Sequence, residues 1–337
     1  MEIEQHIWGM TDQGEAVVLY IMRNSAGAEV RLSTYGAAVI AVKVPDRAAH
    51  IDDVVLGYKR FESYFGDAAA CGKCLGRCAG RIAYGQLPIG DEVHRLEINN
   101  GVHHLHGGTK GFANRLWEGR VETNRVVMSL TSEEGDQGYP GTLNVEVIFD
   151  FDDDNTLEIT YLARTDCTTA VNLTHQIYFN LAGEAAGNVL NHELQLNATQ
   201  VVELDDQQLP TGTLLAVAET LQDFQTFRPL GTNIDLPFAV ASWKPNILSE
   251  VATLRCSQSG RSVSLSTSHP CVVVNAGSRL SGGCPETKSG GRYADYAGVA
   301  LVCQNYSDAV HQPNFPSALL NPDALYCQKI VYTFGTF

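Results

Sequence analysis

The chain has 337 residues, 44% of them hydrophobic and 18% charged, a composition that is typical of globular proteins and excludes a disordered or fibrous chain. Its 38 acidic and 23 basic residues give a net charge of -15. Because this charge repels nucleic acid and anionic membrane surfaces at long range, we expect a small-molecule partner and neither nucleic acid nor membrane.

The first ten residues, MEIEQHIWGM, contain neither the basic segment nor the apolar segment of a secretory signal. No later stretch approaches the roughly 18 consecutive apolar residues of a membrane-spanning helix. The nine cysteines are odd in number and scattered, which favours reduced thiols in a reducing compartment. We therefore expect a cytoplasmic protein.

Alternation of side chains with period two, broken by turn residues, recurs along the chain and predicts strands. Residues 17–22 and 29–32 flank a turn at 24–27, which predicts a hairpin. The same pattern returns at 145–151 and 156–162, around an acidic turn, and again at 262–267 and 271–275. Helical patterns are few. The sequence predicts an all-β fold, a large antiparallel β-sandwich, in one domain over residues 1–337.

Two clusters resemble metal-binding patterns. Cys71, Cys74 and Cys78 include a C-x-x-C spacing that can hold a soft metal, but no second pair follows at ligand spacing. The acidic run at 150–154 lacks the glycine that an EF-hand loop needs. We expect buried thiols in the first case, a solvated hairpin turn in the second, and no metal.

The most specific pattern begins at residue 76. It comprises GRCAGRIA (76–83), INNG (98–101), HLHGG (104–108), GF (111–112), LW (116–117), NLT (172–174), YFNL (178–181), LPTG (209–212) and QPNFPS (312–317). With these motifs the chain resembles the aldose 1-epimerase (galactose mutarotase) family over nearly its whole length. The resemblance implies a β-supersandwich with a sugar site in an open cleft and no cofactor or metal.

Members of that family interconvert the α and β anomers of a free aldose such as galactose or glucose. A base takes the proton of the anomeric hydroxyl while an acid protonates the ring oxygen, so the ring opens and recloses. The family's base is a glutamate and its acid a histidine. Alignment on the flanking motifs places Gln176 at the acid position and Val302 at the base position, and neither side chain has a titratable proton to transfer.

His175 lies beside the acid position, and strand alternation indicates whether it can replace the acid. Neighbouring side chains of a strand point to opposite faces. One face carries Leu173, His175, Ile177, Phe179 and Leu181, and the other carries Thr174, Gln176, Tyr178 and Asn180. We therefore expect His175 in the core, and a β-bulge that re-aims it is the alternative.

Four more positions are compared with the residues that bind the sugar in the family. Arg81 offers a fixed fork of donors to sugar hydroxyls, with an ion pair to an acidic neighbour as the alternative. Gln304 matches a family glutamine. Gly80 stands where the family has a sugar-binding asparagine, and Asp235 is the candidate for its sugar-binding aspartate.

Histidines and aromatic residues complete the candidates. Alternation places His104 and His106 on one face and His103 on the other. His106 precedes two glycines that allow close backbone approach, which favours a ligand role, and a structural hydrogen bond is the alternative. We expect Trp117 and Tyr306 to pack rather than to stack on a sugar.

Three functions are open at this point. The chain is a sugar 1-epimerase in which His106 is the retained catalytic candidate, a non-catalytic sugar-binding or sensing relative, or an enzyme that acts on another ligand in the same cleft. The predicted substrate-binding residues are Arg81, His106, Gln176, Tyr178, Val302 and Gln304.

Overall fold

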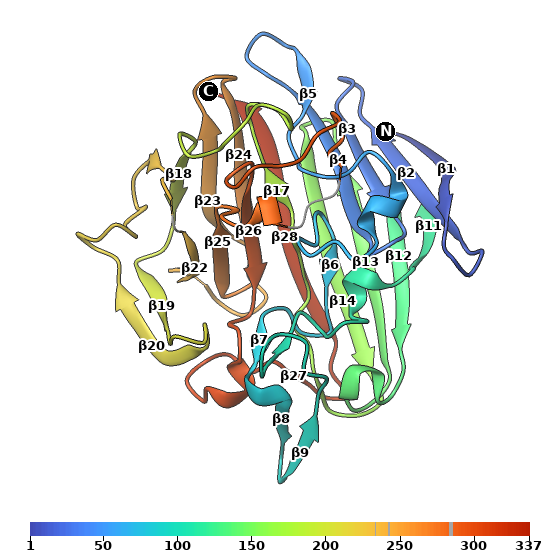
Figure 1. The fold of residues 1–337 in the computed structure, drawn as a ribbon, viewed down its shortest axis with the longest axis vertical. Coiled ribbons are helices and arrows are strands. Elements are labelled where there is room, and N and C mark those ends of the chain that lie inside the picture. The colour runs from blue at the N-terminus through green and yellow to red at the C-terminus, as the bar shows by residue number, and fades with distance from the viewer. Residues whose placement is uncertain (233, 242, 283–285) are drawn as a thin grey trace.

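The computed structural model describes residues 1–232, 234–241, 243–282 and 286–337. The predicted all-β architecture is confirmed, because the ribbon consists of antiparallel sheets and the helices of the described residues are short 3-10 turns (Figure 1). The N-terminal strands lie at one side of the molecule and the strands near residue 200 at the other.

Three large sheets contain most of the strands. The first has the order β1 (Glu2–Met10), β2 (Ala16–Arg23), β3 (Glu29–Ser33), β4 (Ala38–Pro45) and β5 (Ile51–Asp53). The second has the order β11 (Glu118–Glu122), β12 (Arg125–Ser132), β13 (Leu143–Phe151), β14 (Thr156–Thr165), β28 (Tyr326–Thr336), β24 (Arg261–Thr267), β23 (Ser249–Cys256), β18 (Glu193–Leu196) and β21 (Arg228–Pro229). The third has the order β17 (Tyr178–Phe179), β26 (Val299–Gln304), β25 (Cys271–Asn275), β22 (Asp235–Ala239), β19 (Gln200–Leu204) and β20 (Pro210–Ala216).

Short elements connect these sheets. Four strand pairs are β7 (Arg81–Ile82) with β10 (His104–Leu105), β6 (Cys74–Leu75) with β16 (Thr174–His175), β15 (Thr169–Ala170) with β27 (Leu319–Leu320), and β8 (Gln86–Ile89) with β9 (Glu92–Arg95). The 3-10 turns are η1 (Phe61–Tyr64), η2 (Ala83–Gly85), η3 (Phe112–Asn114), η4 (Asp136–Gly138), η5 (Leu280–Gly282) and η6 (Ala309–His311). In the described residues, no helix has the length and hydrophobicity needed to span a membrane.

Both hairpins predicted from the first two patterns form. β2 pairs with β3, and β13 pairs with β14. The acidic run makes the turn of the second hairpin, where the Asp152 carboxylate accepts hydrogen bonds from the backbone N–H groups of Asp154 (2.9 Å) and Thr156 (2.8 Å). An Asx-type turn therefore explains this run.

The third pattern gives two strands that do not pair with each other. β24 belongs to the nine-stranded sheet and β25 to the six-stranded sheet, so the chain changes sheets between them. The expectation of a third local hairpin is therefore wrong. The change carries β25 to the sheet that forms the cavity described below.

One continuous cluster of buried side chains joins the large sheets. It includes residues from Tyr20 in the first sheet to Phe334 in the second, with Val274 and Leu301 from the third. Burial of apolar surface on this scale is the main stabilising contribution to such a fold.

His175 lies inside this core, as strand alternation predicts. It is fully buried, the hydroxyl of Tyr161 contacts its Nδ1 at 2.6 Å, and its Nε2 lies 2.9 Å from the carbonyl oxygen of Ala37. Because a carbonyl only accepts, Nε2 carries the proton and Nδ1 accepts from the tyrosine. Both ring nitrogens are thus used in structural hydrogen bonds, and no bulge turns the ring toward the ligand face.

The three cysteines of the C-x-x-C region are buried thiols in the structure. Burial raises the pKa of Cys74 and raises that of Cys78 to about 12, so both stay protonated near neutral pH. Among the described residues, no three His, Cys, Asp or Glu side chains gather closely enough to hold a metal ion.

Buried neutral histidines make stability depend on pH. Burial lowers the pKa of His175 to about 4 and that of His269 to about 3, whereas an unfolded chain has histidine pKa values of about 6.5. Between these values the unfolded state binds more protons, so the free energy of unfolding falls as the pH falls. We expect each histidine to contribute up to about 1.4 kcal/mol per pH unit in urea titrations between pH 6.5 and pH 5.

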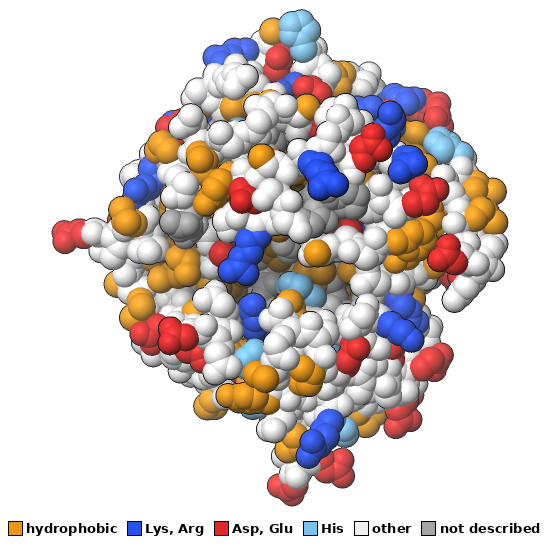
Figure 2. Space-filling view, viewed as in Figure 1, with side chains coloured by type: hydrophobic (Ala, Val, Ile, Leu, Met, Phe, Trp, Pro, Cys, Tyr) orange, Lys and Arg blue, Asp and Glu red, His pale blue; other side chains and the backbone are white. Residues whose placement is uncertain are grey.

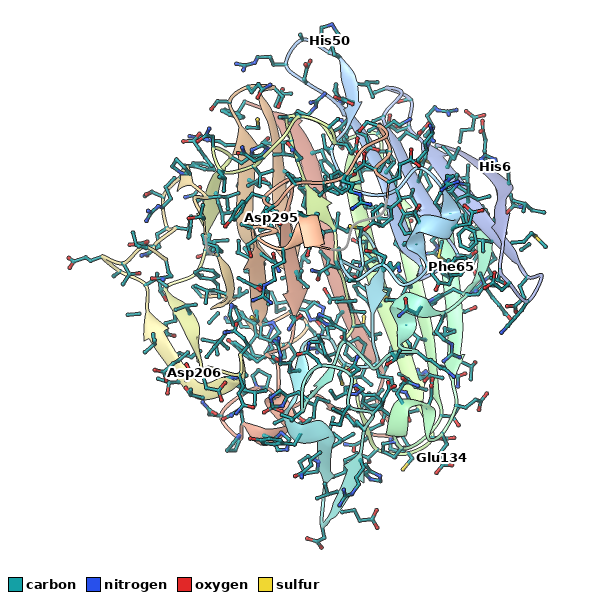
Figure 3. All side chains as sticks on the ribbon, viewed as in Figure 1. His6, His50, Phe65, Glu134, Asp206 and Asp295 are labelled. Atoms are coloured by element: carbon teal, nitrogen blue, oxygen red, sulfur yellow. The ribbon has the colours of Figure 1, made fainter. Side chains whose placement is uncertain are left out.

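The variant His175→Gln should reduce this slope, because it removes one of the contributing groups. The control is His6→Gln, since His6 lies exposed on β1 (Figure 3). An equal slope in the wild type and in His175→Gln would contradict the account.

Candidate functional site

A cavity of about 180 Å³ lies between the six-stranded sheet and the segments that carry β7 and β10. Five of the six predicted substrate-binding residues line it: Arg81, His106, Gln176, Val302 and Gln304. The candidate aspartate Asp235 lines it too. Figure 2 shows a hollow near the middle of the displayed face, with basic and histidine side chains around it.

Gln176 lies between two short strands that pair with different partners. β16 ends at His175 and pairs with β6, while β17 begins at Tyr178 and pairs with β26. The Nε2 group of Gln176 donates a hydrogen bond to the hydroxyl of Tyr178 at 2.9 Å. Alternation survives this interruption, since Ile177 and Phe179 join the core while Gln176 faces the cavity.

β26 presents Val302 and Gln304 to the same cavity. The alternate residues Leu301 and Cys303 belong to the core. Val302 is only 3% exposed, so it forms part of an apolar wall at the position where the resemblance implies a base. β25 pairs with β26, and its residues Val273 and Asn275 line the cavity beside them.

His106 enters the cavity through an unusual backbone conformation. β10 ends at Leu105, and His106 adopts a φ of 53°, in the left-handed region. The next residue, Gly107, approaches another segment so closely that an added Cβ would lie 1.7 Å from the carbonyl oxygen of Gly76. The glycine is therefore required, as the sequence indicates.

The protonation state of His106 follows from its contacts. Its Nδ1 accepts a hydrogen bond from the backbone N–H of Gly80 at 3.1 Å, which assigns the ring proton to Nε2. Burial, with a smaller effect of Arg81, lowers the pKa of His106 to about 4. At neutral pH the ring is uncharged and its free N–H is a donor rather than a base.

His103 and His104 have structural roles. His104 is fully buried, with Nδ1 2.6 Å from the carbonyl oxygen of Glu97 and Nε2 2.7 Å from the hydroxyl of Tyr139. His103 accepts from the backbone N–H of Tyr84 at 3.1 Å. The expectation that His104 shares a face with His106 is wrong, because the left-handed turn at His106 ends the alternation.

Arg81 lies beside His106, because it pairs with Leu105 of β10. Its Nε donates to Asn100 at 3.2 Å, and its backbone N–H donates to the hydroxyl of Ser307 at 2.7 Å. Within the described residues Arg81 forms no ion pair closer than 4.0 Å, although the Asp235 carboxylate acts on it electrostatically and opposes the lowering of the Arg81 pKa by burial.

The hydroxyl of Ser307 occupies the space beside Gly80. Gly80 has a φ of 78°, and a Cβ added to it would lie 2.7 Å from Ser307 Oγ. A side chain at position 80 therefore conflicts with the present position of Ser307. Ser307 is a cavity residue that the sequence analysis missed, and no periodic pattern marks it.

Among the described residues that line this cavity, Asp235 is the only carboxylate. It begins β22, directly across from Asn275 of β25. Burial raises the pKa of the Asp235 carboxyl, whereas the positive charges of Arg81 and Arg279 lower it. Asn275 was also missed, although pairing of 271–275 with 299–304 places it on the face of Val302.

Tyr178 lines an adjoining cleft of about 380 Å³ rather than the cavity itself. The two spaces share Asp235 and Asn275. The other predicted aromatic residues pack as expected. Trp117 is buried against Phe112 with ring centroids 5.6 Å apart, and Tyr306 stacks on Phe315 with centroids 4.4 Å apart.

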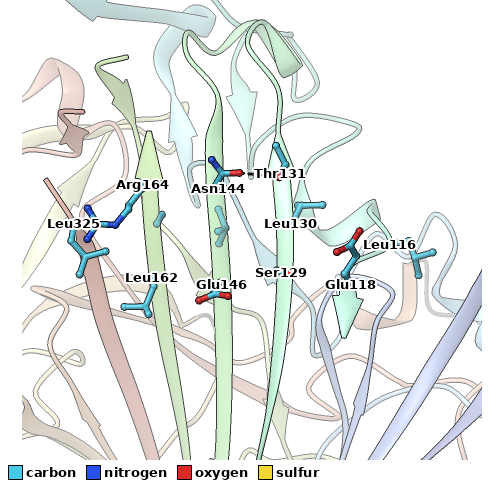
Figure 4. A pocket seen from close by; sticks show the side chains of 12 residues that line it. Leu116, Glu118, Ser129, Leu130, Thr131, Asn144, Glu146, Leu162, Arg164 and Leu325 are labelled. Carbon is cyan, nitrogen blue, oxygen red and sulfur yellow. Dashed lines mark hydrogen bonds between the residues drawn. The ribbon is translucent and has the colours of Figure 1, made fainter. Parts of the chain in front are cut away.

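A larger groove, of about 680 Å³, lies elsewhere, over strands β11 to β14 and residue Leu325 (Figure 4). Glu118 and Glu146 line it, but none of the predicted site residues does. Glu146 accepts a hydrogen bond from Arg120 at 2.7 Å. We assign the candidate site to the smaller cavity, because Arg81, His106 and Asp235 converge there.

Comparison with known proteins agrees with this architecture. A family model described as aldose 1-epimerase matches residues 18–333. The galactose mutarotase of Bos taurus is 34% identical over 342 residues, which cover 99% of each chain. The aldose 1-epimerase of Escherichia coli is 31% identical over 340 residues, with 96% of this chain and 97% of the relative covered.

Solved structures give the same result. An aldose epimerase homologue from C. elegans superposes with a TM-score of 0.87 at 30% identity and covers 94% of this chain and 98% of its own. A galactose 1-epimerase from Lactobacillus acidophilus shares the fold, with a TM-score of 0.84, 23% identity and 99% of both chains covered. The chain belongs to the aldose 1-epimerase family.

Proposed function

We propose that the cavity binds a monosaccharide ring and that the protein is a weak mutarotase or a non-catalytic sugar-binding member of its family. The observation that carries this proposal is the composition of one cavity. Arg81, His106 and Asp235 can supply donors and an acceptor for sugar hydroxyls, and the same cavity is lined by Gln176 and Val302, which the motif alignment predicts at the positions of the family's acid and base.

Without an acid and a base at positions 176 and 302, the rate of ring opening should be much lower. A positioned acid or base typically contributes about 10² to 10⁴ in rate, and paired groups do not act additively. The amide of Gln176 can hydrogen-bond to a ring oxygen but cannot protonate it, and Val302 offers no proton acceptor. Ring opening in this cavity therefore lacks both of the proton transfers that the family mechanism uses.

His106 does not replace either group in this proposal. Its Nδ1 already accepts from Gly80, and its pKa of about 4 keeps the ring neutral at pH 7. A neutral ring with its proton on Nε2 donates a hydrogen bond to a sugar oxygen. We therefore assign His106 to binding and polarisation of the sugar.

A second candidate is a mutarotase in which Asp235 acts as the base. It is favoured by the place of this carboxylate in the cavity lining, together with burial, which raises its pKa and makes it a better proton acceptor. Any activity of the wild type should then disappear in Asp235→Asn while a sugar still binds. Activity that persists in Asp235→Asn would exclude this candidate.

Restoring the two missing groups should restore catalysis. We expect the double variant Gln176→His with Val302→Glu to raise the rate of mutarotation of fresh α-galactose or α-glucose by about tenfold or more over wild type, measured by polarimetry. Each single variant should gain less, because one proton transfer stays uncatalysed.

The matched control for this experiment is Gln176→His with Val302→Gln, which adds a polar side chain of similar size but no base. Circular dichroism and sugar binding establish that each variant is folded and occupied. A wild-type rate equal to that of an active relative, or a folded and sugar-bound double variant without any gain, would refute the proposal.

Sugar binding itself should depend on Arg81 and His106. We expect Arg81→Ala or His106→Ala to weaken the affinity for galactose or glucose by about tenfold, because each change removes a polar partner from the cavity. Titration calorimetry measures the affinity, and thermal melting checks the fold. Arg95→Ala is the control, since Arg95 is exposed and lies outside the cavity lining. Unchanged affinity in both cavity variants would contradict the assignment.

A further inference from the structure

The tip of the β19–β20 hairpin supplies a part of the cavity wall that the proposed sugar contacts do not use. Leu204 and Gln208 line the same cavity as Arg81 and His106. Asp206 marks the hairpin tip in Figure 3. In the described chain only the first two residues of β19 pair with β22, so the tip extends beyond this pairing. Contacts other than the sheet must therefore fix its position.

Residues 205–209 form a tight turn that sets the direction of Gln208. The Asp205 carboxylate accepts hydrogen bonds from the backbone N–H groups of Gln207 (2.8 Å) and Leu209 (2.9 Å). Gln208 has a φ of 64°, in the left-handed region, which is unfavourable for a residue with a long side chain. Turns with the same backbone hydrogen bonds hold smaller residues at the corresponding position, namely Gly14, Gly27, Ala49 and Asn155.

A side-chain hydrogen bond joins this tip to the segment that carries His106. Nε2 of His103 lies 2.9 Å from Oε1 of Gln207. Nδ1 of His103 accepts from the backbone N–H of Tyr84 at 3.1 Å, so the proton of the neutral ring is on Nε2 and is donated to Gln207. His103 is only 4% exposed, which makes it a fixed anchor. The bond therefore connects two segments that both line the cavity.

The electrostatics of Arg81 also place the tip close to the site. Burial lowers the pKa of Arg81, and the carboxylates of Asp235 and Asp205 oppose this effect. Because the interaction between charges falls with distance, Asp205 and the turn that it stabilises lie within reach of the guanidinium. The turn and Arg81 thus belong to one site.

The carboxamide of Gln208 is available to a ligand. Its side chain is exposed, and it makes no hydrogen bond to another side chain or backbone group among the described residues. A primary amide combines two N–H donors with an oxygen acceptor, whereas Arg81 and neutral His106 offer donors and an ionised Asp235 only accepts. Neighbouring hydroxyl groups of a sugar both donate and accept, so the amide matches them in a way that the other three groups do not.

We propose that Gln208 binds a pair of neighbouring hydroxyl groups on the sugar ring and thereby contributes to sugar specificity. Gln207 is a positioning residue, because its bond to His103 holds the turn that carries Gln208. This inference rests on the proposed function, since it requires that the cavity hold a monosaccharide.

The first test removes the carboxamide. Titration calorimetry with galactose and glucose should show an affinity about fivefold or more lower in Gln208→Ala and in Gln208→Gly than in the wild type. Gln208→Gly suits the left-handed backbone and preserves the turn. The matched control is Gln5→Ala, since Gln5 is exposed on β1 and lies outside the cavity lining.

Monodeoxy analogues of the sugar that binds more tightly, each lacking one hydroxyl, test specificity. For at least one analogue, the loss of affinity relative to the parent sugar should be about threefold or more smaller in Gln208→Ala than in the wild type, because the partner of that hydroxyl is already absent. Equal losses for every analogue in both proteins would refute a contact between Gln208 and the sugar.

The second test concerns the positioning bond. We expect Gln207→Ala to lower the affinity by about threefold or more, and Gln207→Glu, which retains an acceptor for His103, to restore it. In the Gln208→Ala background, Gln207→Ala should cause no further loss, because the residue that it positions is gone. Thermal melting checks the fold of each variant.

The outcomes separate this inference from the proposed function. A wild type that binds sugar, with affinity unchanged in both Gln208 variants, would refute the inference and leave the proposed function intact. A full loss from Gln207→Ala in the Gln208→Ala background would refute the positioning role. A wild type that binds neither galactose nor glucose would refute the proposed function and the inference together.

Discussion

Successive side chains of β26 alternate between the hydrophobic core and the cavity, and the candidate site depends on this alternation. Leu301 and Cys303 belong to the core, while Val302 and Gln304 line the cavity. A shift of one residue in this strand would bury an amide and expose two apolar side chains, so the register is strongly fixed. β25 and β17 both pair with β26. The register of β26 therefore also fixes where Asn275 and Tyr178 lie.

The sequence could therefore predict which strand residues face the cavity, because side chains alternate along a strand. It correctly separated His175 from Gln176, because the core supplies a strong energetic reason for one face to be apolar. It failed at His106, where the left-handed backbone breaks the period, and at 262–275, where adjacent strands enter different sheets. Gln208 carries no pattern at all. Its place at the cavity is set by the fold of a turn, which a local period does not encode.

Two positions where the sequence predicts a difference from the family, Gly80 and Gln176, each contact a neighbouring side chain. Gly80 leaves room for Ser307, whose hydroxyl bonds to the backbone of Arg81, and Gln176 bonds to Tyr178. A new side chain at either position therefore has to fit beside Ser307 or Tyr178 as they now lie. An asparagine at position 80 would conflict with Ser307 unless that side chain moved. The cavity is thus a consistent arrangement of its own.

Val302 shows why binding and proton transfer can separate in this fold. A carboxylate at a site only 3% exposed must be desolvated, and an unpaired buried charge is costly. A valine avoids that cost and packs with the apolar residues around Tyr178. Arg81 and His106, the donors proposed to hold a sugar, lie on different segments with their own hydrogen bonds. A valine at position 302 is therefore compatible with the proposed sugar binding, because neither donor depends on it for a hydrogen bond.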